Sequence, residues 1–154
     1  VTVDAVYHAY LAVYERRWRF KTRPYEGIAG LLDACVAAGL PIAVYSNKPD
    51  RFTRMTVEAL LPSWPWAVIR GQRPGTARKP APDGALAVAA EVGVRPEDCV
   101  FLGDSEADMH CARAAGMPAI GALWGFRSRE EIVAAGAHHV AEAPAAVWEV
   151  VRGR

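Results

Sequence analysis

Short apolar runs that alternate with helical stretches constrain the fold of this chain more than any other feature. The runs predict strands at 41–45, 66–70, 99–102, 118–123 and 138–140. Between them, apolar residues recur at helical spacing, and glycines follow the predicted helices as stop signals: Gly39, Gly93, Gly116 and Gly136. Asp50 is expected to cap the helix after the first strand, and Ser128 with Glu131 is a capping-box signature for a later helix. Helices and strands that alternate through loops of a few residues are typical of an α/β fold with a doubly wound parallel sheet.

The size and composition indicate one globular domain. The chain has 154 residues, of which 52% are hydrophobic and 23% charged. Its formal net charge of +1 predicts no broad field for nucleic acid or an anionic membrane, and no apolar run approaches membrane-spanning length. We expect neither kind of partner.

The cysteines predict a reducing environment. Cys35, Cys99 and Cys111 are odd in number and far apart, so neither a disulfide framework nor a CxxC metal site is indicated. Cys35 and Cys99 lie in apolar runs and are expected to be small buried hydrophobes. A cytoplasmic location follows from this interpretation.

The first helix is predicted from an aromatic stripe. Val3, Tyr7, Tyr10, Tyr14 and Trp18 are spaced four, three, four and four residues apart, which places them on one face of an amphipathic helix. We expect that face to pack against the rest of the chain.

Polar clusters follow three of the predicted strands directly. They are Ser46-Asn47-Lys48, the segment from Asp104, and Trp124–Arg127. In a doubly wound sheet, ligands bind beyond the carboxyl ends of the strands. The convergence of the three clusters on one edge therefore predicts an active site.

The acidic cluster is compatible with a metal ion. Asp104 follows an apolar strand, and Asp108 lies one helical turn later on the same face. Two carboxylates so placed suit Mg²⁺ when a phosphate shares the ion. Helix capping is the competing interpretation of Asp104 or Ser105, although it leaves Asp108 unexplained.

The hydroxyl cluster and a later lysine are compatible with phosphate. The Ser46 hydroxyl and the Asn47 backbone can hold phosphoryl oxygens, and Lys79 can neutralise their charge. Taken singly, these residues are better explained as an ordinary polar turn and a surface lysine, and Lys48 is expected to point to solvent. Three arginines are interpreted as surface or substrate-edge charges: Arg70, Arg73 and Arg78.

The order of these features resembles the haloacid dehalogenase superfamily. A hydroxyl after one strand, a lysine before a later helix and GDxxxD after the next strand are similar to its motifs two, three and four. Tyr45–Pro49, Arg78–Pro82 and Trp124–Arg127 resemble the phosphoglycolate phosphatase branch, and Pro24–Gly27 resembles the return from a cap to the core. Of these segments, Trp124–Arg127 would line the rim of the site.

The resemblance implies a function and a role for each residue. Ser46 would bind the transferred phosphoryl group with the Asn47 backbone, and Lys79 would neutralise the nucleophile and the phosphoryl oxygens. Asp104 would coordinate Mg²⁺, with Asp108 supporting it directly or through water. The implied reaction is hydrolysis of a small phosphorylated metabolite through an aspartyl-phosphate, with phosphoglycolate as the family-level expectation.

One departure from the family pattern concerns the nucleophile. The family's first motif, DxDGT, ends a central strand, and the only N-terminal candidate is Asp4, which has no Gly-Thr after it and lies in the predicted first helix. We reject Asp4, and we expect residues 1–20 to be the end of a helical cap and 21–154 a core that lacks its first strand. The family places that strand between those ending at Ser46 and Asp104, so its loss would leave inner edges uncovered. We hypothesise that the chain is part of a longer enzyme.

Two other functions stay open at the level of sequence. One is a non-catalytic phosphate- or protein-binding module that has lost its nucleophile. The other is a dehalogenase, which the carboxylates Asp104 and Asp108 disfavour because that chemistry is metal-free. Neither GxGxxG nor GxxxxGK[ST] is present, which argues against dinucleotide or nucleoside-triphosphate binding. The oligomeric state is open.

Overall fold

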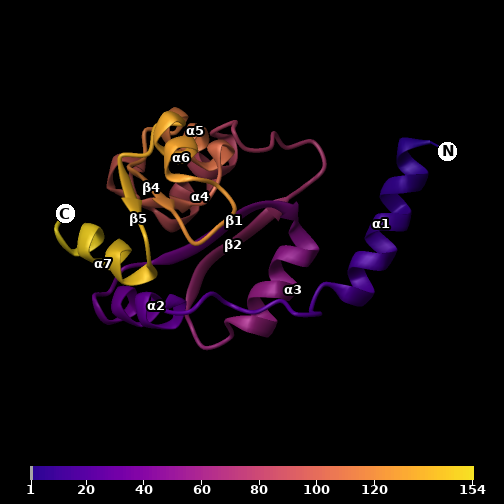
Figure 1. Ribbon diagram of the computed structural model, residues 1–154, viewed down its shortest axis with the longest axis horizontal. Coiled ribbons are helices and arrows are strands. Elements are labelled where there is room, and N and C mark those ends of the chain that lie inside the picture. Colours follow the sequence, from indigo (N-terminus) through magenta and orange to yellow (C-terminus); the bar gives the residue numbers. More distant parts are fainter. Residues whose placement is uncertain (1) are drawn as a thin grey trace.

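The computed structural model describes residues 2–154 and confirms the α/β fold (Figure 1). All the helices and strands expected from the sequence are present, with ends that differ by a few residues. The helices are α1 (Val3–Arg17), α2 (Ile28–Ala37), α3 (Asp50–Leu60), α4 (Asp83–Val92), α5 (Glu106–Ala114), α6 (Arg129–Ala134) and α7 (Pro144–Arg152). The strands are β1 (Ile42–Pro49), β2 (Trp66–Gln72), β3 (Phe101–Gly103), β4 (Ala119–Ala122) and β5 (His139–Ala141). No described helix combines the length and the apolar character that crossing a membrane requires.

All the strand pairs are parallel, but they form two sheets. β1 pairs with β2, and β3, β4 and β5 form a second sheet in that order. Among the described residues, no strand joins β1 to β3. The single sheet expected from the sequence is therefore interrupted between two strands: β1, which carries Ser46, and β3, which Asp104 follows.

Helices cover both faces of the strands (Figure 1). Strand β4 shows the alternation, because Ile120 packs with Leu31 of α2 and Val147 of α7, whereas Gly121 faces α6. A Cβ at Gly121 would overlap the Ile132 side chain. The face opposite α2 and α7 packs against α4, α5 and α6. β4 is buried throughout, as expected for the middle strand of a covered parallel sheet.

A cavity of about 670 Å³ lies between β1 and β3 and is called the slot from here on. Ala43 and Tyr45 of β1 line it, together with Phe101 and Leu102 of β3 and side chains of α2, α4 and α7. Ala43 is exposed and β3 is only half-buried, in contrast to β4. The slot is therefore bordered by two strand edges that lack a partner within residues 2–154.

The slot also changes the environment of two cysteines. Cys35 and Cys99 line it and are half-buried, so they are less enclosed than the sequence suggested. Cys111, a residue of α5, is fully buried in the core. All three thiols are free.

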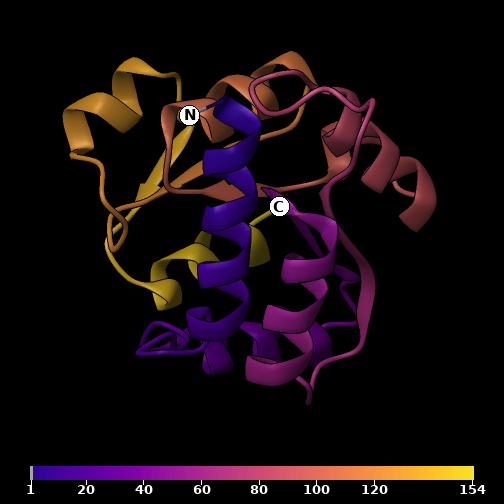
Figure 2. The same ribbon diagram turned by 90° about the vertical axis from the view of Figure 1, so that its right-hand side faces the viewer.

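Helix α1 lies at the end of the molecule away from α7, beyond α3 (Figures 1 and 2). None of its described residues is buried. Its contact with the core is made by Tyr14, whose ring lies edge-on at 4.9 Å from Phe52 of α3, and by an ion pair from Glu15 to Arg51. Tyr10 is 56% exposed, so the predicted aromatic stripe packs only in its C-terminal half.

Helix α3 begins differently from the expectation that Asp50 caps it. Pro49 is the N-cap residue, and Asp50 is the first helical residue. Its carboxylate accepts a hydrogen bond of 2.8 Å from the Gly71 N–H and pairs with Arg54 and Arg73. The capping prediction was wrong because a tertiary bond to β2 takes up this carboxylate.

Candidate active site

Lys79 connects the carboxyl end of β1 with the start of α5. Its ammonium donates to Asp108 Oδ1 at 2.7 Å and to the Tyr45 carbonyl at 3.3 Å. The side chains of Lys79 and Asp108 are only 12% and 8% exposed. Because both side chains are largely shielded from water, each charge is stabilised mainly by the other. The structure thus brings together a lysine and a carboxylate that are distant in the sequence.

The same ammonium lies beside the slot. It is 5.3 Å from the centroid of the Tyr45 ring and 5.9 Å from that of Phe101. These rings come from β1 and β3, and both line the slot. Aromatic faces attract a cation, so the rings help to hold the positive charge where the two open strands approach one another.

Asn47 fixes the backbone of Lys79 through its side chain. Asn47 Nδ2 donates to the Lys79 carbonyl at 3.1 Å, and the Lys79 N–H donates to Asn47 Oδ1 at 2.9 Å. The sequence suggested only a backbone role for Asn47, and no signal in the local sequence indicated this long-range amide pair. Ser46 Oγ accepts from the Lys48 N–H at 3.1 Å, which leaves its own proton available to a phosphoryl oxygen.

Asp108 is held on both carboxylate oxygens. While Oδ1 binds Lys79, Oδ2 accepts from the Ser105 hydroxyl at 2.6 Å and from the N–H groups of Ser105 and Asp104 at 3.1 and 3.2 Å. Ser105 and Asp108 form a capping box at the start of α5. Helix capping therefore explains Asp108 after all. A metal contact by Asp108 stays a prediction.

Asp104 has different surroundings at the carboxyl end of β3. It is half-buried, and within residues 2–154 its carboxylate has no hydrogen bond or ion pair. Gly125 lies against it, since a Cβ there would be 2.6 Å from the Asp104 Cβ. Gly103 makes similar room, because its Cβ would be 2.6 Å from Asp108 Cγ. The sequence showed both glycines beside strand ends, but only the structure shows that they admit the carboxylates.

The residues present fit part of a magnesium site. Among residues 2–154, no three His, Cys, Asp or Glu side chains converge as a metal-binding group. Mg²⁺ often takes only one or two protein carboxylates and completes its shell with waters and phosphate oxygens. Asp104 suits one such position, and the remaining ligands must come from substrate, water or a segment outside the chain.

Two other predicted positions, Lys48 and Arg70, differ from the expectation. Lys48, expected in solvent, is half-buried, and its ammonium lies 5.6 Å from the centroid of the Tyr14 ring. Arg70, interpreted as a surface or substrate-edge charge, is half-buried and pairs with Glu91 of α4. In the predicted rim, Phe126 is 92% exposed.

The comparisons with known proteins agree with this geometry. The family model described as haloacid dehalogenase-like hydrolase matches residues 2–122. The chain belongs to this family. Its fold superimposes on the crystal structure of a candidate phosphoglycolate phosphatase from Lactobacillus delbrueckii subsp. bulgaricus, with a TM-score of 0.90 and 32% identity. That match covers 98% of this chain and 64% of the other.

Two curated relatives carry the name phosphoglycolate phosphatase. One, from Xylella fastidiosa strain 9a5c, is 39% identical over 126 residues, which are 79% of this chain and 53% of the relative. The other, from Xanthomonas campestris pv. campestris strain 8004, is 32% identical over 151 residues, which are 95% of this chain and 66% of the relative. The haloacid dehalogenase-like chain thus spans about half the length of the first of these relatives.

Proposed function

We propose that this chain is the phosphate- and metal-binding part of a magnesium-dependent phosphatase that hydrolyses a small phosphate monoester. The position of the Lys79 ammonium carries the proposal. It is held by Asp108 near the start of α5 and by the Tyr45 carbonyl of β1, and Ser46 directly follows Tyr45 in that strand. The family membership and the relatives' names support the same function.

The chain's own residues would bind and neutralise the transferred phosphoryl group. The Ser46 hydroxyl and the Asn47 N–H would donate to two of its oxygens, and Lys79 would bind a third. Positive and hydrogen-bonding groups fixed in advance stabilise the charge that phosphoryl transfer places on these oxygens. The Asn47–Lys79 amide pair would keep the donors at a constant spacing.

Magnesium would be held in part by Asp104. When bound, the ion would supply further neutralisation of the phosphoryl oxygens. Gly125 makes room for this carboxylate, and Asp108 orients the backbone N–H of Asp104. A direct or water-mediated contact from Asp108 is part of the proposal.

The attacking carboxylate is proposed to lie on a strand in the slot, outside residues 1–154. A strand residue occupies roughly 160 Å³ by the usual rise and spacings, so the slot of about 670 Å³ admits about four residues. Such a strand would pair with both open edges, and its carboxyl end would lie beside Lys79. Asp4 does not meet this requirement, because it is exposed in the first turn of α1.

The remaining parts of the proposal are more general. Residues 1–20 would be the end of a helical cap, and residues 21–154 the core without its first strand. A phosphorylated metabolite, with phosphoglycolate as the first candidate, would be the substrate. The three free thiols favour a cytoplasmic location.

The test is a phosphatase assay on the protein translated from the complete reading frame that contains residues 1–154. We expect Mg²⁺-dependent release of phosphate from a panel of small monoesters. Asp104→Asn should reduce kcat/KM by at least about 100-fold, in the range for removal of one electrostatic group. Asp33→Asn on the exposed side of α2 is the matched control. Phosphate binding without any turnover would instead indicate the non-catalytic module.

A further inference from the structure

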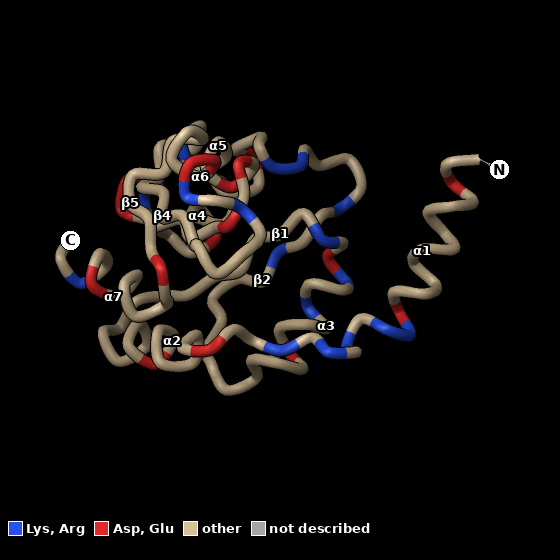
Figure 3. Tube along the Cα trace, in the orientation of Figure 1, with Lys and Arg blue, Asp and Glu red and all other residues tan. Residues whose placement is uncertain are grey.

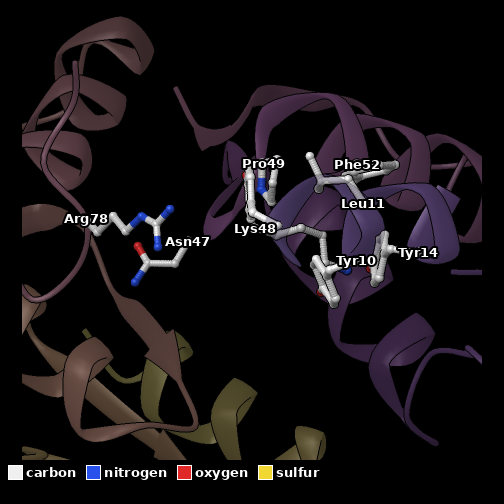
Figure 4. Close-up of a pocket in the computed structure, with 9 residues that line it drawn as sticks. Tyr10, Leu11, Tyr14, Asn47, Lys48, Pro49, Phe52 and Arg78 are labelled. Atoms are coloured by element: carbon white, nitrogen blue, oxygen red, sulfur yellow. The ribbon is translucent and has the colours of Figure 1, made fainter. Parts of the chain in front are cut away.

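Several cations lie near the carboxyl end of β1, but their side chains point in different directions. Figure 3 shows Lys and Arg at the end of β1 and along the loop after β2. In Figure 4, Lys48 extends toward α1, whereas Arg78 lies beside Asn47. The Lys79 ammonium instead bonds to a carbonyl of β1 and lies 5.9 Å from the centroid of the Phe101 ring in β3. Of these three cations, Lys79 is thus the one that contacts both open strands.

The Lys79 ammonium uses two of its three N–H donors within the protein. One donates to Asp108 Oδ1 and another to the Tyr45 carbonyl. Within residues 2–154, this ammonium makes no further hydrogen bond. Since an ammonium carries three donors, one remains for a phosphoryl oxygen.

Two aromatic rings hold the ammonium without occupying that third donor. The Tyr45 ring of β1 has its centroid 5.3 Å from Lys79 Nζ, and the Phe101 ring of β3 has its centroid 5.9 Å away. At these distances the face of a ring attracts a cation. A second carboxylate at the same place would neutralise the charge that the phosphoryl group needs. Neutral rings hold the cation and leave its charge available.

Packing fixes both rings. They lie against the core cluster that contains residues of α4 and α5. A Cβ at Gly84 of α4 would overlap the Tyr45 ring, so only glycine leaves room for the ring there. The Tyr45 hydroxyl is buried and has no hydrogen-bond partner among the described residues. The ring, and not the hydroxyl, is therefore the part of this side chain that acts on Lys79.

We infer that Tyr45 and Phe101 are positioning residues, whose ring faces hold the Lys79 ammonium so that its third N–H points to the transferred phosphoryl group. This inference rests on the proposed phosphatase function. The attraction between a ring and a shielded cation corresponds to about 3- to 30-fold in a rate or equilibrium constant.

The first experiment weakens the face of the Phe101 ring while keeping its shape. In the protein from the complete reading frame, Phe101 is replaced by phenylalanines that carry one, two or three ring fluorines, which withdraw charge from the face. We expect kcat/KM for para-nitrophenyl phosphate to fall stepwise by about 3- to 30-fold, mainly in kcat, because Lys79 stabilises the group in transfer. The same series at Phe52, which is buried in α3, is the matched control and should leave kcat/KM unchanged.

Two variants separate the ring of Tyr45 from its hydroxyl. Tyr45→Phe keeps the ring and should retain the wild-type kcat/KM. Tyr45→Leu removes the ring but keeps the backbone carbonyl, so it should lower kcat/KM as the fluorines do. An equal loss in both variants would show that the hydroxyl acts, and would overturn the role of the ring.

A measurement of stability tests the same contact without turnover. Lys79→Met combined with Asp108→Asn removes the cation and leaves no unpaired buried charge. In urea, the fluorines at Phe101 should shift the unfolding equilibrium by about 3- to 30-fold when Lys79 is present and should have no effect in the double variant.

Equal effects of the fluorines in the two backgrounds, or an unchanged kcat/KM along the Phe101 series, would overturn the inference. A failure of the proposed function would look different. Wild type would then release no phosphate from any monoester, while the stability measurement would still detect the contact between the ring and the ammonium.

Discussion

Asp104 and Asp108 are one helical turn apart but have opposite surroundings. Asp108 is buried and bonded on both oxygens, one of them to the Lys79 ammonium. Asp104 keeps its carboxylate free of partners within the described chain and has Gly125 against it. These surroundings support the proposal that Asp108 organises the site and that Asp104 holds the metal ion.

Replacing each carboxylate should therefore have a different effect. Asp108→Asn removes the charge that pairs with buried Lys79, and breaking such a pair costs about 3–5 kcal/mol. Asp104→Asn should change the free energy of unfolding by less than about 0.5 kcal/mol while it abolishes the effect of Mg²⁺ on turnover. Urea denaturation measures the stabilities. Equal destabilisation by the two variants would contradict these roles.

A second residue-level prediction concerns Gly125. In Gly125→Ala, the new Cβ would meet Asp104 atoms closer than side chains tolerate, so Asp104 must move. We expect a loss of stability of about 1–3 kcal/mol and a fall in kcat/KM. Gly30→Ala is the control, because open space surrounds Gly30 and alanine favours the helix by about 0.5–1 kcal/mol. Full activity of Gly125→Ala would show that the position of Asp104 is unimportant.

Strand and helix ends are the elements that determine this site. The open edges of β1 and β3 form the slot, and Asn47 and Lys79 connect the end of β1 to the loop before α4. Helix α3 is tied to β2 by the bond from Gly71 to Asp50. The slot and the hydrogen bond between α3 and β2 can each be tested separately.

The slot predicts a pattern of thiol protection. Cys35 and Cys99 line the slot, so a strand inside it should slow their alkylation at least about tenfold in the complete protein relative to residues 1–154 alone. Cys111 should react in neither, because burial raises its pKa to about 11 and leaves about one thiolate in a thousand at pH 8. Mass spectrometry of peptides from maleimide-treated protein measures the rates. Equal protection of Cys35 and Cys99 in both proteins would argue against an occupied slot.

The α3–β2 connection predicts a dependence of stability on pH. Burial alone would raise the pKa of Asp50, but hydrogen bonds from Gly71, Arg54 and Arg73 outweigh it and hold the pKa below the usual range. A lowered folded-state pKa contributes stability above the unfolded value of about 4, and that stability is lost as the pH falls through the folded value. The advantage of wild type over Asp50→Asn in urea should therefore shrink below about pH 4. A constant difference down to pH 2 would contradict this account.

Over the whole molecule, local sequence patterns predicted the helices and strands but not the tertiary contacts. Apolar periodicity and glycine stops located every helix and strand, and the capping box of Ser128 with Glu131 is confirmed. Asp50 failed as a cap and Lys48 failed as a solvent charge because Gly71 and Tyr14, which are distant in the sequence, decide their positions. The candidate site residues were proposed from their order along the chain. Their bonds to one another were not, since no periodicity encodes them.

The central claim is that these residues bind the phosphoryl group while a carboxylate outside them attacks it. The most direct measurement is to trap the phosphoryl-enzyme of the complete protein during turnover, reduce the acyl phosphate and locate the modified residue by mass spectrometry. Our account predicts an aspartate outside residues 1–154, on an apolar segment that fits the slot. Modification of Asp4, or of any other carboxylate within residues 1–154, would contradict it.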